Sequence, residues 1–248
     1  MVNDGPAPGR RVRALADEYA GTEVHHSLYL PADLERGGAY PVIAEYPGNG
    51  PYRNGTGDAC TGKVEDCSLG YGLSGGRGFI WLCLPFVSAD GGRNQLQWWG
   101  DVEATVRYCK EVLPRVCTRY GGDPSKVFLA GFSRGSIACN FIGLHDDKIA
   151  SLWRGFICHS HYDGVRKWPY PGSDRPAAAG RLARLGDRPQ FISQEVSVEE
   201  TRRYLSEAGA TGEFTFQAIP YRNHTDSWVL RDIPERAAAR VWLNETLV

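Results

Sequence analysis

The sequence predicts an α/β fold in which a mostly parallel, doubly wound β-sheet is flanked by helices. Short apolar segments typical of strands alternate with helix-like segments along the chain, which is the pattern of successive βαβ units. Residues Phe79 to Val87 form a nearly unbroken apolar run, as expected of a strand buried on both faces of a parallel sheet. No internal repeat or long linker interrupts the pattern, so we expect one domain over residues 1–248.

The individual elements follow from periodicity and from turn residues. We expect strands at Val24–Leu30, Tyr40–Tyr46, Phe79–Val87, Lys126–Ala130, Gly155–Cys158, Gln190–Ser193 and Phe214–Ile219. Helices are expected at Asp101–Tyr120, where Asp101 can cap the start and Pro114 can cause a kink, and at Gly135–Trp153, Val198–Ala208 and Pro234–Leu247. Residues 50–78 and 162–188 are rich in glycine or proline and are predicted to be long loops near the site.

Charge and hydropathy exclude several classes of partner. Lys and Arg total 28 against 29 Asp and Glu, so the chain lacks the basic excess that binding nucleic acid through its phosphates requires. No apolar stretch approaches the length of a membrane-spanning helix. The segment Met1–Arg11 is polar, so we expect no signal peptide in this chain, and the compartment stays open.

The seven cysteines divide into two groups. Five lie in predicted strands and helices, where free cysteine packs like a small hydrophobe: Cys83, Cys109, Cys117, Cys139 and Cys158. Cys60 and Cys67 instead flank a polar loop and could form a local disulfide, which would imply an oxidising compartment. Their spacing does not match a zinc site, because no second CxxC or HxxxH pair accompanies it.

The sharpest motif is Gly131-Phe132-Ser133-Arg134-Gly135, which lies between a predicted strand and a predicted helix. This is the G-x-S-x-G elbow in the strand–turn–helix setting that it requires. Side chains in place of Gly131 and Gly135 would collide with the neighbouring helix and strand. The turn would raise the Ser133 hydroxyl above the carboxyl edge of the sheet, so Ser133 is the predicted nucleophile.

A serine nucleophile needs a general base, and a carboxylate that orients that base. Among six histidines, His224 follows the last predicted strand and precedes the last helix, where the base is expected. Glu195 is the first carboxylate after the strand Gln190–Ser193 and is the predicted acid. Asp163, which follows the strand Gly155–Cys158, is the alternative.

Two backbone N–H donors should stabilise the oxyanion that such a nucleophile creates. The residue after the nucleophile, Arg134, supplies one of them. The other is expected from Gly48 or Asn49, in the glycine-rich turn after the strand Tyr40–Tyr46. No cofactor or metal is needed for this chemistry, and none is predicted.

The motifs together resemble the α/β-hydrolase superfamily. Leu28–Pro31, Tyr40–Ile43 and Tyr120–Val127 before the elbow are similar to the single-domain feruloyl and acetyl-xylan esterases and polyhydroxybutyrate depolymerases. The resemblance implies an α/β-hydrolase fold and a serine carboxylic-ester hydrolase acting on a small-molecule or carbohydrate ester, including aromatic esters. The chain departs from that group at Tyr46-Pro47-Gly48, where His-Gly is usual, and at Arg134, where a small residue is usual.

Several side chains allow more than one interpretation. The Arg134 side chain could reach the mouth of the site and attract an anionic substrate, or form a salt bridge on the helix surface. Trp98 and Trp99 could wall the cleft, or one of them could pack beneath the loop.

Two other functions are compatible with the sequence. His159, His161 and Asp163 have HxHxD spacing, which would suit a metal-dependent hydrolase. A non-catalytic binding protein on the same fold is the third possibility.

Overall fold

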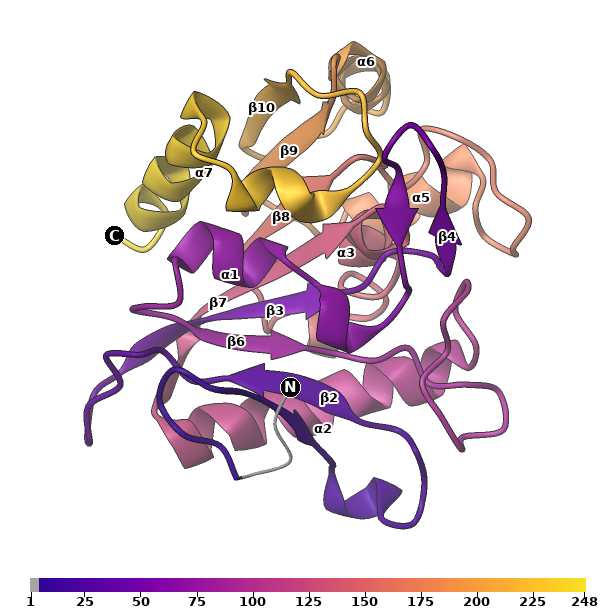
Figure 1. Ribbon diagram of the computed structural model, residues 1–248. Coiled ribbons are helices and arrows are strands. Elements are labelled where there is room, and N and C mark those ends of the chain that lie inside the picture. The colour runs from indigo at the N-terminus through magenta and orange to yellow at the C-terminus, as the bar shows by residue number, and fades with distance from the viewer. Residues whose placement is uncertain (1–4) are drawn as a thin grey trace.

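The computed structural model describes residues 5–248 and contains an eight-stranded sheet in the order β1-β2-β6-β3-β7-β8-β9-β10 (Figure 1). The strands are β1 (Arg11–Ala14), β2 (His26–Tyr29), β3 (Tyr40–Tyr46), β6 (Ile80–Cys83), β7 (Gly122–Phe132), β8 (Gly155–His159), β9 (Gln190–Glu195) and β10 (Phe214–Ile219). From β6 to β10 all neighbours are parallel, whereas β2 pairs antiparallel with both β1 and β6. The start of the polar N-terminal segment, residues 1–4, lies outside the described residues.

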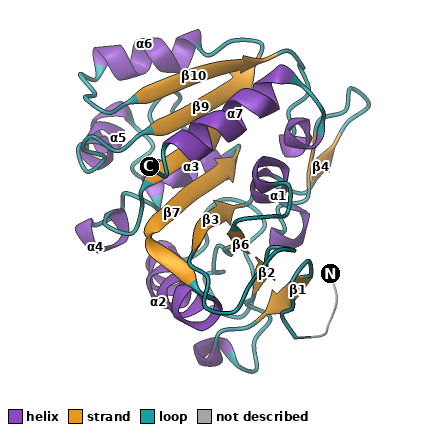
Figure 2. Cartoon of the chain, turned by 90° about the vertical axis from the view of Figure 1, so that its left-hand side faces the viewer, coloured by secondary structure: helices purple, strands orange, loops and turns teal. Residues whose placement is uncertain are grey.

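Helices cover both faces of this sheet. They are α1 (Leu69–Ser74), α2 (Val102–Tyr120), α3 (Arg134–Phe141), α4 (Asp147–Ala150), α5 (Arg175–Leu182), α6 (Glu199–Glu207) and α7 (Pro234–Glu245). Figures 1 and 2 show α1 and α7 on one face and α2, α3 and α5 on the other. A two-stranded hairpin of β4 (Tyr52–Arg53) and β5 (Ala59–Cys60) stands apart from the main sheet. Among residues 5–248, no helix has the length and apolar character needed to cross a bilayer.

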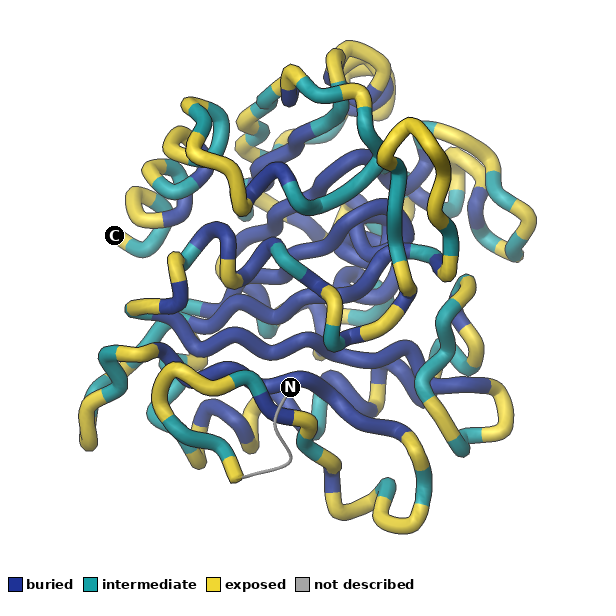
Figure 3. Tube along the Cα trace, in the orientation of Figure 1, coloured by how far each residue is buried: buried dark blue, intermediate teal, exposed yellow. Residues whose placement is uncertain are grey.

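The central strands are buried on both faces, as their apolar sequences predict (Figure 3). On β3, Val42 and Ala44 belong to the apolar cluster on the α2 and α3 side, whereas Ile43 between them belongs to the cluster on the α1 and α7 side. This alternation follows from the two-residue period of a strand. The parallel strands from β6 to β10 in the sheet order end at one common edge.

The predicted fold class is confirmed, and β3 and β10 have the predicted bounds. The predicted helix at Gly135–Trp153 is wrong in extent, because α3 ends at Phe141 and α4 forms separately. The chain turns at Gly143. Only glycine fits there, because a Cβ would lie 2.3 Å from the Cys139 carbonyl oxygen. The two predicted loops are also partly ordered: residues 50–78 include α1 and the hairpin, and residues 162–188 include α5.

The predicted burial of five cysteines is confirmed, whereas the suggested disulfide does not form. The five that were expected in core elements are all buried: Cys83, Cys109, Cys117, Cys139 and Cys158. Cys60 and Cys67 do not form the suggested disulfide and are both free thiols in the structure.

Candidate active site

Ser133 occupies a sharp turn between β7 and α3, with the unusual backbone angles φ 55° and ψ −114°. A Cβ at Gly131 would lie 2.1 Å from the carbonyl carbon of Gly135, at the start of α3. A Cβ at Gly135 would lie 2.0 Å from the carbonyl oxygen of Tyr46, at the end of β3. The two glycines thus permit the turn for the steric reason expected from the sequence.

Replacing Gly131 with alanine is expected to destabilise the fold by about 3 kcal/mol or more, because the new methyl group overlaps backbone that cannot move independently. Gly180 provides the matched control, because it lies in α5 and a Cβ there would meet nothing within 4 Å. Gly180→Ala is expected to stabilise the chain by about 0.5–1 kcal/mol. Urea unfolding of the two variants measures both effects, and equal stabilities would contradict the steric role of Gly131.

The structure brings Ser133, His224 and Glu195 together in a continuous hydrogen-bonded line. His224 Nε2 lies 3.0 Å from Ser133 Oγ, and His224 Nδ1 lies 2.9 Å from Glu195 Oε1. The Ser133 hydroxyl makes no helix-capping hydrogen bond, so it is free to face the imidazole. Glu195 is the last residue of β9, whereas the sequence suggested a position in the following loop.

The small hairpin holds the loop that carries His224. The His224 backbone N–H donates to the Asp58 carboxylate at 2.8 Å, and its carbonyl accepts from the Tyr52 hydroxyl at 3.3 Å. The Tyr52 ring also stacks on the imidazole, with ring centroids 5.9 Å apart. The predicted loop at residues 50–78 therefore supports the site directly.

Electrostatics keep the Glu195 carboxylate ionised and two neighbouring imidazoles neutral. Burial favours the neutral form of Glu195, but the hydrogen bond to His224 and the nearby His159 lower its pKa to about 2. Burial lowers the pKa of both His159 and His161 to about 4, so neither carries charge at neutral pH. The carboxylate can therefore stabilise positive charge on His224 without competition from a second charged imidazole.

The alternative acid, Asp163, does not reach His224. Its carboxylate is buried and accepts two hydrogen bonds from Arg181, at 2.8 and 3.0 Å. His159 instead contacts Ser193 Oγ at 3.0 Å and the Thr225 carbonyl at 3.3 Å. Within residues 5–248, no three His, Cys, Asp or Glu side chains lie close enough to hold a metal ion, so the HxHxD spacing does not produce a metal site there.

The candidate oxyanion donors lie on two elements that meet at the elbow. The N–H groups of Gly48, Asn49 and Arg134 have no hydrogen-bond partner among the described residues. A Cβ at Gly48 would lie 2.7 Å from Cys60 Sγ and 2.9 Å from the Phe132 ring, so the turn approaches its neighbours at a distance only glycine allows. The Asn49 side chain accepts from the Trp98 N–H at 2.7 Å and fixes the turn to the next loop.

The Arg134 side chain fits neither interpretation made from the sequence. It is buried, with 1% of its surface exposed, and stacks over the Phe86 ring at 4.0 Å. It donates to the carbonyl groups of Trp98 at 2.6 Å and Gln95 at 3.3 Å, while burial lowers its pKa to about 9. Arg134 therefore fastens the loop that in turn holds Asn49, and it does not present its charge at the mouth of the site.

The two tryptophans differ in burial, as the second interpretation of the sequence proposed. Trp99 is buried and stacks on Phe141 at 4.5 Å. Trp98 is half-buried, and its ring centroid lies 5.5 Å from that of Trp168. The Trp168 ring centroid lies in turn 5.1 Å from that of His161. His161 is 4.9 Å from the His224 ring, so a half-buried row of aromatic rings extends from the site.

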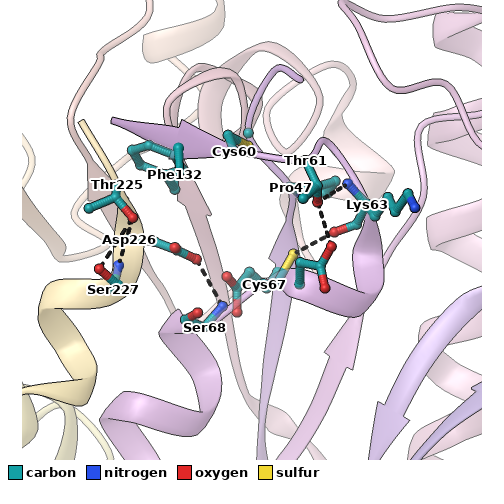
Figure 4. Close-up of a pocket in the computed structure, with 14 residues that line it drawn as sticks. Pro47, Cys60, Thr61, Lys63, Cys67, Ser68, Phe132, Thr225, Asp226 and Ser227 are labelled. Atoms are coloured by element: carbon teal, nitrogen blue, oxygen red, sulfur yellow. Dashed lines mark hydrogen bonds between the residues drawn. The ribbon is translucent and has the colours of Figure 1, made fainter. Parts of the chain in front are cut away.

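A cavity of about 220 Å³ adjoins the turn that contains Gly48 and the loop that follows His224 (Figure 4). Gly48, Phe132 and Thr225 line it on the side of the site. Figure 4 shows Asp226 beside Thr225, with Lys63 across the cavity from them. Burial and the neighbouring Glu45 raise the pKa of Asp226 to about 7, so the lining of the cavity is less negative at neutral pH than its composition suggests.

Comparison of the sequence with protein-family models and with curated proteins finds no match. Solved structures resemble the chain in fold, at 12–15% sequence identity. A structure described in an analysis of two fungal esterases from Rhizomucor miehei gives a TM-score of 0.62 at 12% identity, over 96% of this chain and 82% of that chain. An acetyl ester-xyloside bifunctional hydrolase from Caldicellulosiruptor lactoaceticus gives 0.59 at 13% identity, over 97% and 96%.

A thermostable esterase gives a TM-score of 0.55 at 15% identity over 95% of this chain, which spans 62% of the length of that esterase. The chain therefore has the α/β-hydrolase fold, as the resemblance in sequence implied.

Ser160 was not predicted as a site residue, yet its hydroxyl lies 2.9 Å from Glu195 Oε1 and 2.7 Å from His224 Nδ1. The sequence motif involved its neighbours His159 and His161, whereas the serine between them contacts the side chains of Glu195 and His224. The available signal was its position at the end of β8, the strand next to the one that carries Glu195.

Proposed function

We propose that this protein is a serine carboxylic-ester hydrolase in which Ser133, His224 and Glu195 act as nucleophile, base and acid. One observation carries the proposal: the hydrogen-bonded line from Ser133 Oγ through the imidazole to a carboxylate whose pKa is about 2. An ionised carboxylate at Nδ1 keeps the proton on that nitrogen and leaves Nε2 free to accept one.

The first half of the reaction would form an acyl-enzyme. His224 Nε2 takes the proton of Ser133 as its oxygen attacks the ester carbonyl, and the negative charge develops on the carbonyl oxygen. The unpartnered N–H of Arg134, together with that of Gly48 or Asn49, would donate to this oxyanion. Collapse expels the alcohol, which leaves with the proton that His224 returns.

The second half would release the acid. Water enters the position left by the alcohol, gives its proton to His224 and attacks the acyl carbon, and Ser133 departs with that proton. The imidazolium formed in each half faces the Glu195 carboxylate at 2.9 Å, which lowers the energy of both transition states.

The surroundings favour esters that carry a sugar or aromatic group. The half-buried rings of Trp98, Trp168 and His161 offer a stacking surface for a planar or sugar ring. Of the proteins compared above, one is named as a fungal esterase and one as an acetyl ester-xyloside bifunctional hydrolase. We therefore expect acetylated sugars and hydroxycinnamoyl esters to be turned over along with short p-nitrophenyl esters.

Covalent labelling tests the proposal directly. A fluorophosphonate is expected to add once per chain, on the peptide that contains Ser133, and to abolish hydrolysis of p-nitrophenyl acetate in proportion to labelling. The same rate in the presence of a chelator would exclude a metal-dependent reaction. Labelling of another residue, or hydrolysis that survives complete labelling, would refute the assignment.

A further inference from the structure

Ser160 has a backbone conformation that serine rarely adopts. Its φ is 84°, in the left-handed region that favours glycine, and it is buried, with 6% of its surface exposed. Among residues 5–248, only three other non-glycine residues have a positive φ: Trp98, Ser133 and Val196. Strained backbone of this kind persists where the surrounding structure fixes it, and it occurs often at functional sites.

Two hydrogen bonds hold the peptide of Ser160 in place. Its N–H donates to the Ser193 carbonyl on β9 at 2.8 Å. Its carbonyl accepts from the Gln194 side chain at 2.9 Å, and the same amide nitrogen donates to Thr201 Oγ1 on α6 at 2.8 Å. The position of Ser160 relative to the acid-bearing strand is therefore fixed from both ends of the residue.

The hydroxyl of Ser160 completes a triangle with the acid and the base. Its three sides are Ser160 Oγ to His224 Nδ1 at 2.7 Å, Ser160 Oγ to Glu195 Oε1 at 2.9 Å, and His224 Nδ1 to Glu195 Oε1 at 2.9 Å. The ionised carboxylate only accepts, so the hydroxyl donates its proton to Glu195. The Nδ1 proton of His224 is then shared between the carboxylate and the lone pair of Ser160.

We propose that Ser160 is a positioning residue, which holds the His224 imidazole in the plane of Glu195 and steadies the Nδ1 proton through a second acceptor. This inference rests on the proposed function, because it concerns the same base and acid. With a single acceptor the ring can rotate about its bond to the carboxylate, whereas two acceptors fix the direction of Nε2 toward Ser133. The effect belongs to the chemical step, so it changes kcat and leaves KM nearly unaltered.

Two substitutions separate the hydroxyl from the backbone. Ser160→Ala removes the hydroxyl and keeps the Cβ, whereas Ser160→Gly removes the hydroxyl and also relieves the left-handed strain. A positioning role predicts that both variants lose about 10–100-fold in kcat, which is the range for one hydrogen bond to a charged group. A role limited to shaping the turn predicts instead that Ser160→Gly keeps its kcat, and that result would overturn the proposal.

Val196→Gly is the matched control for strain. Val196 has a φ of 64°, follows Glu195 directly and is 53% exposed, so glycine there relieves strain without removing a polar contact. This variant is expected to melt a few degrees higher and to keep its kcat. Loss of kcat in Val196→Gly equal to that in Ser160→Gly would trace the effect to backbone flexibility and overturn the role of the hydroxyl.

A measurement without turnover keeps this inference distinct from the proposed function. The low-field proton resonance of His224 Nδ1, assigned by its absence in His224→Gln, is expected to move in Ser160→Ala and to stay in place in Val196→Gly. An unchanged resonance in Ser160→Ala would overturn the proposal even if the enzyme is active. A wild-type chain that neither turns over esters nor reacts with a fluorophosphonate would refute the proposed function, while the resonance still decides the role of Ser160.

Discussion

Ser133→Ala is expected to lower kcat for p-nitrophenyl acetate by a factor on the order of 10⁴–10⁶, to the residual rate supplied by binding and the oxyanion donors alone. The hydroxyl is the only group that the structure presents to His224 Nε2 at hydrogen-bond distance within residues 5–248. The stability of the variant should change little, because the hydroxyl makes no capping bond and the turn is kept by the two glycines.

Ser136→Ala is the control for this experiment. Ser136 lies one turn further along α3 and its hydroxyl donates to the His161 carbonyl, away from the imidazole of His224. Its kcat is expected to stay near that of the wild type, measured in parallel on preparations free of wild-type enzyme. Turnover of Ser133→Ala within tenfold of the wild type would mean that the nucleophile is a different group or an activated water.

Glu195→Gln is the second large effect, with an expected loss of roughly 10³–10⁴-fold in kcat. The amide can present an N–H to Nδ1, which favours the wrong tautomer, and it cannot stabilise the imidazolium as a carboxylate does. The fold should tolerate the change, because glutamine matches glutamate in size and the side chain is only partly buried. Steady-state kinetics and urea unfolding of the same preparation separate these two outcomes.

Asp163→Asn provides the opposite pattern. Asp163 is buried and receives both hydrogen bonds of a paired guanidinium from Arg181, so the neutral side chain leaves a buried cation without its partner. We expect a loss of about 3–5 kcal/mol in unfolding free energy, with kcat per folded molecule near that of the wild type. A mild kinetic effect in Glu195→Gln combined with a severe one in Asp163→Asn would transfer the role of the acid.

The sequence predicts those elements best whose pattern and burial agree. The strand Tyr40–Tyr46 and the helix that Asp101 caps were predictable because apolar spacing, flanking glycines and a capping carboxylate indicate the same boundaries. The short helix α1 was missed because its glycines looked like a loop. They serve packing instead, since a Cβ at Gly70 would lie 2.1 Å from Trp81 and one at Gly72 would lie 2.3 Å from Val229.

Strand β1 was also missed. Its segment is polar, and Arg11 becomes part of a partly buried layer only through contacts that are distant in sequence. The guanidinium stacks over Trp81 at 3.9 Å and donates to Ser27 and to the Val64 carbonyl, both at 2.8 Å. Local patterns contain no information about partners that lie so far along the chain.

The candidate site also has a part that the sequence predicts and a part that it does not. Ser133, His224 and Glu195 could be chosen from chain order, because the fold brings the ends of particular strands to one edge. The burial of the Arg134 side chain and the contacts of Ser160 could not be predicted in this way. They depend on segments that are distant in sequence and meet only in the folded chain. A motif can identify the reacting groups, but it does not show which neighbours hold them in position.

Among residues 5–248, four residues other than glycine have a positive φ. Their backbone strain affects which substitutions this protein can accept as it evolves. Conformations of this kind cost of order 1–3 kcal/mol each, which is large against a typical net stability of about 5–15 kcal/mol. Trp98, Ser133, Ser160 and Val196 thus concentrate local frustration at the edge of the sheet that carries the candidate site. Glycine would relieve this strain, but at Trp98 it would also remove the ring contacts, so selection for heat resistance alone would act first at the exposed Val196. Ser133 is the position where that gain would remove the proposed chemistry outright, so a thermostabilised lineage would be expected to retain serine there and change at Val196.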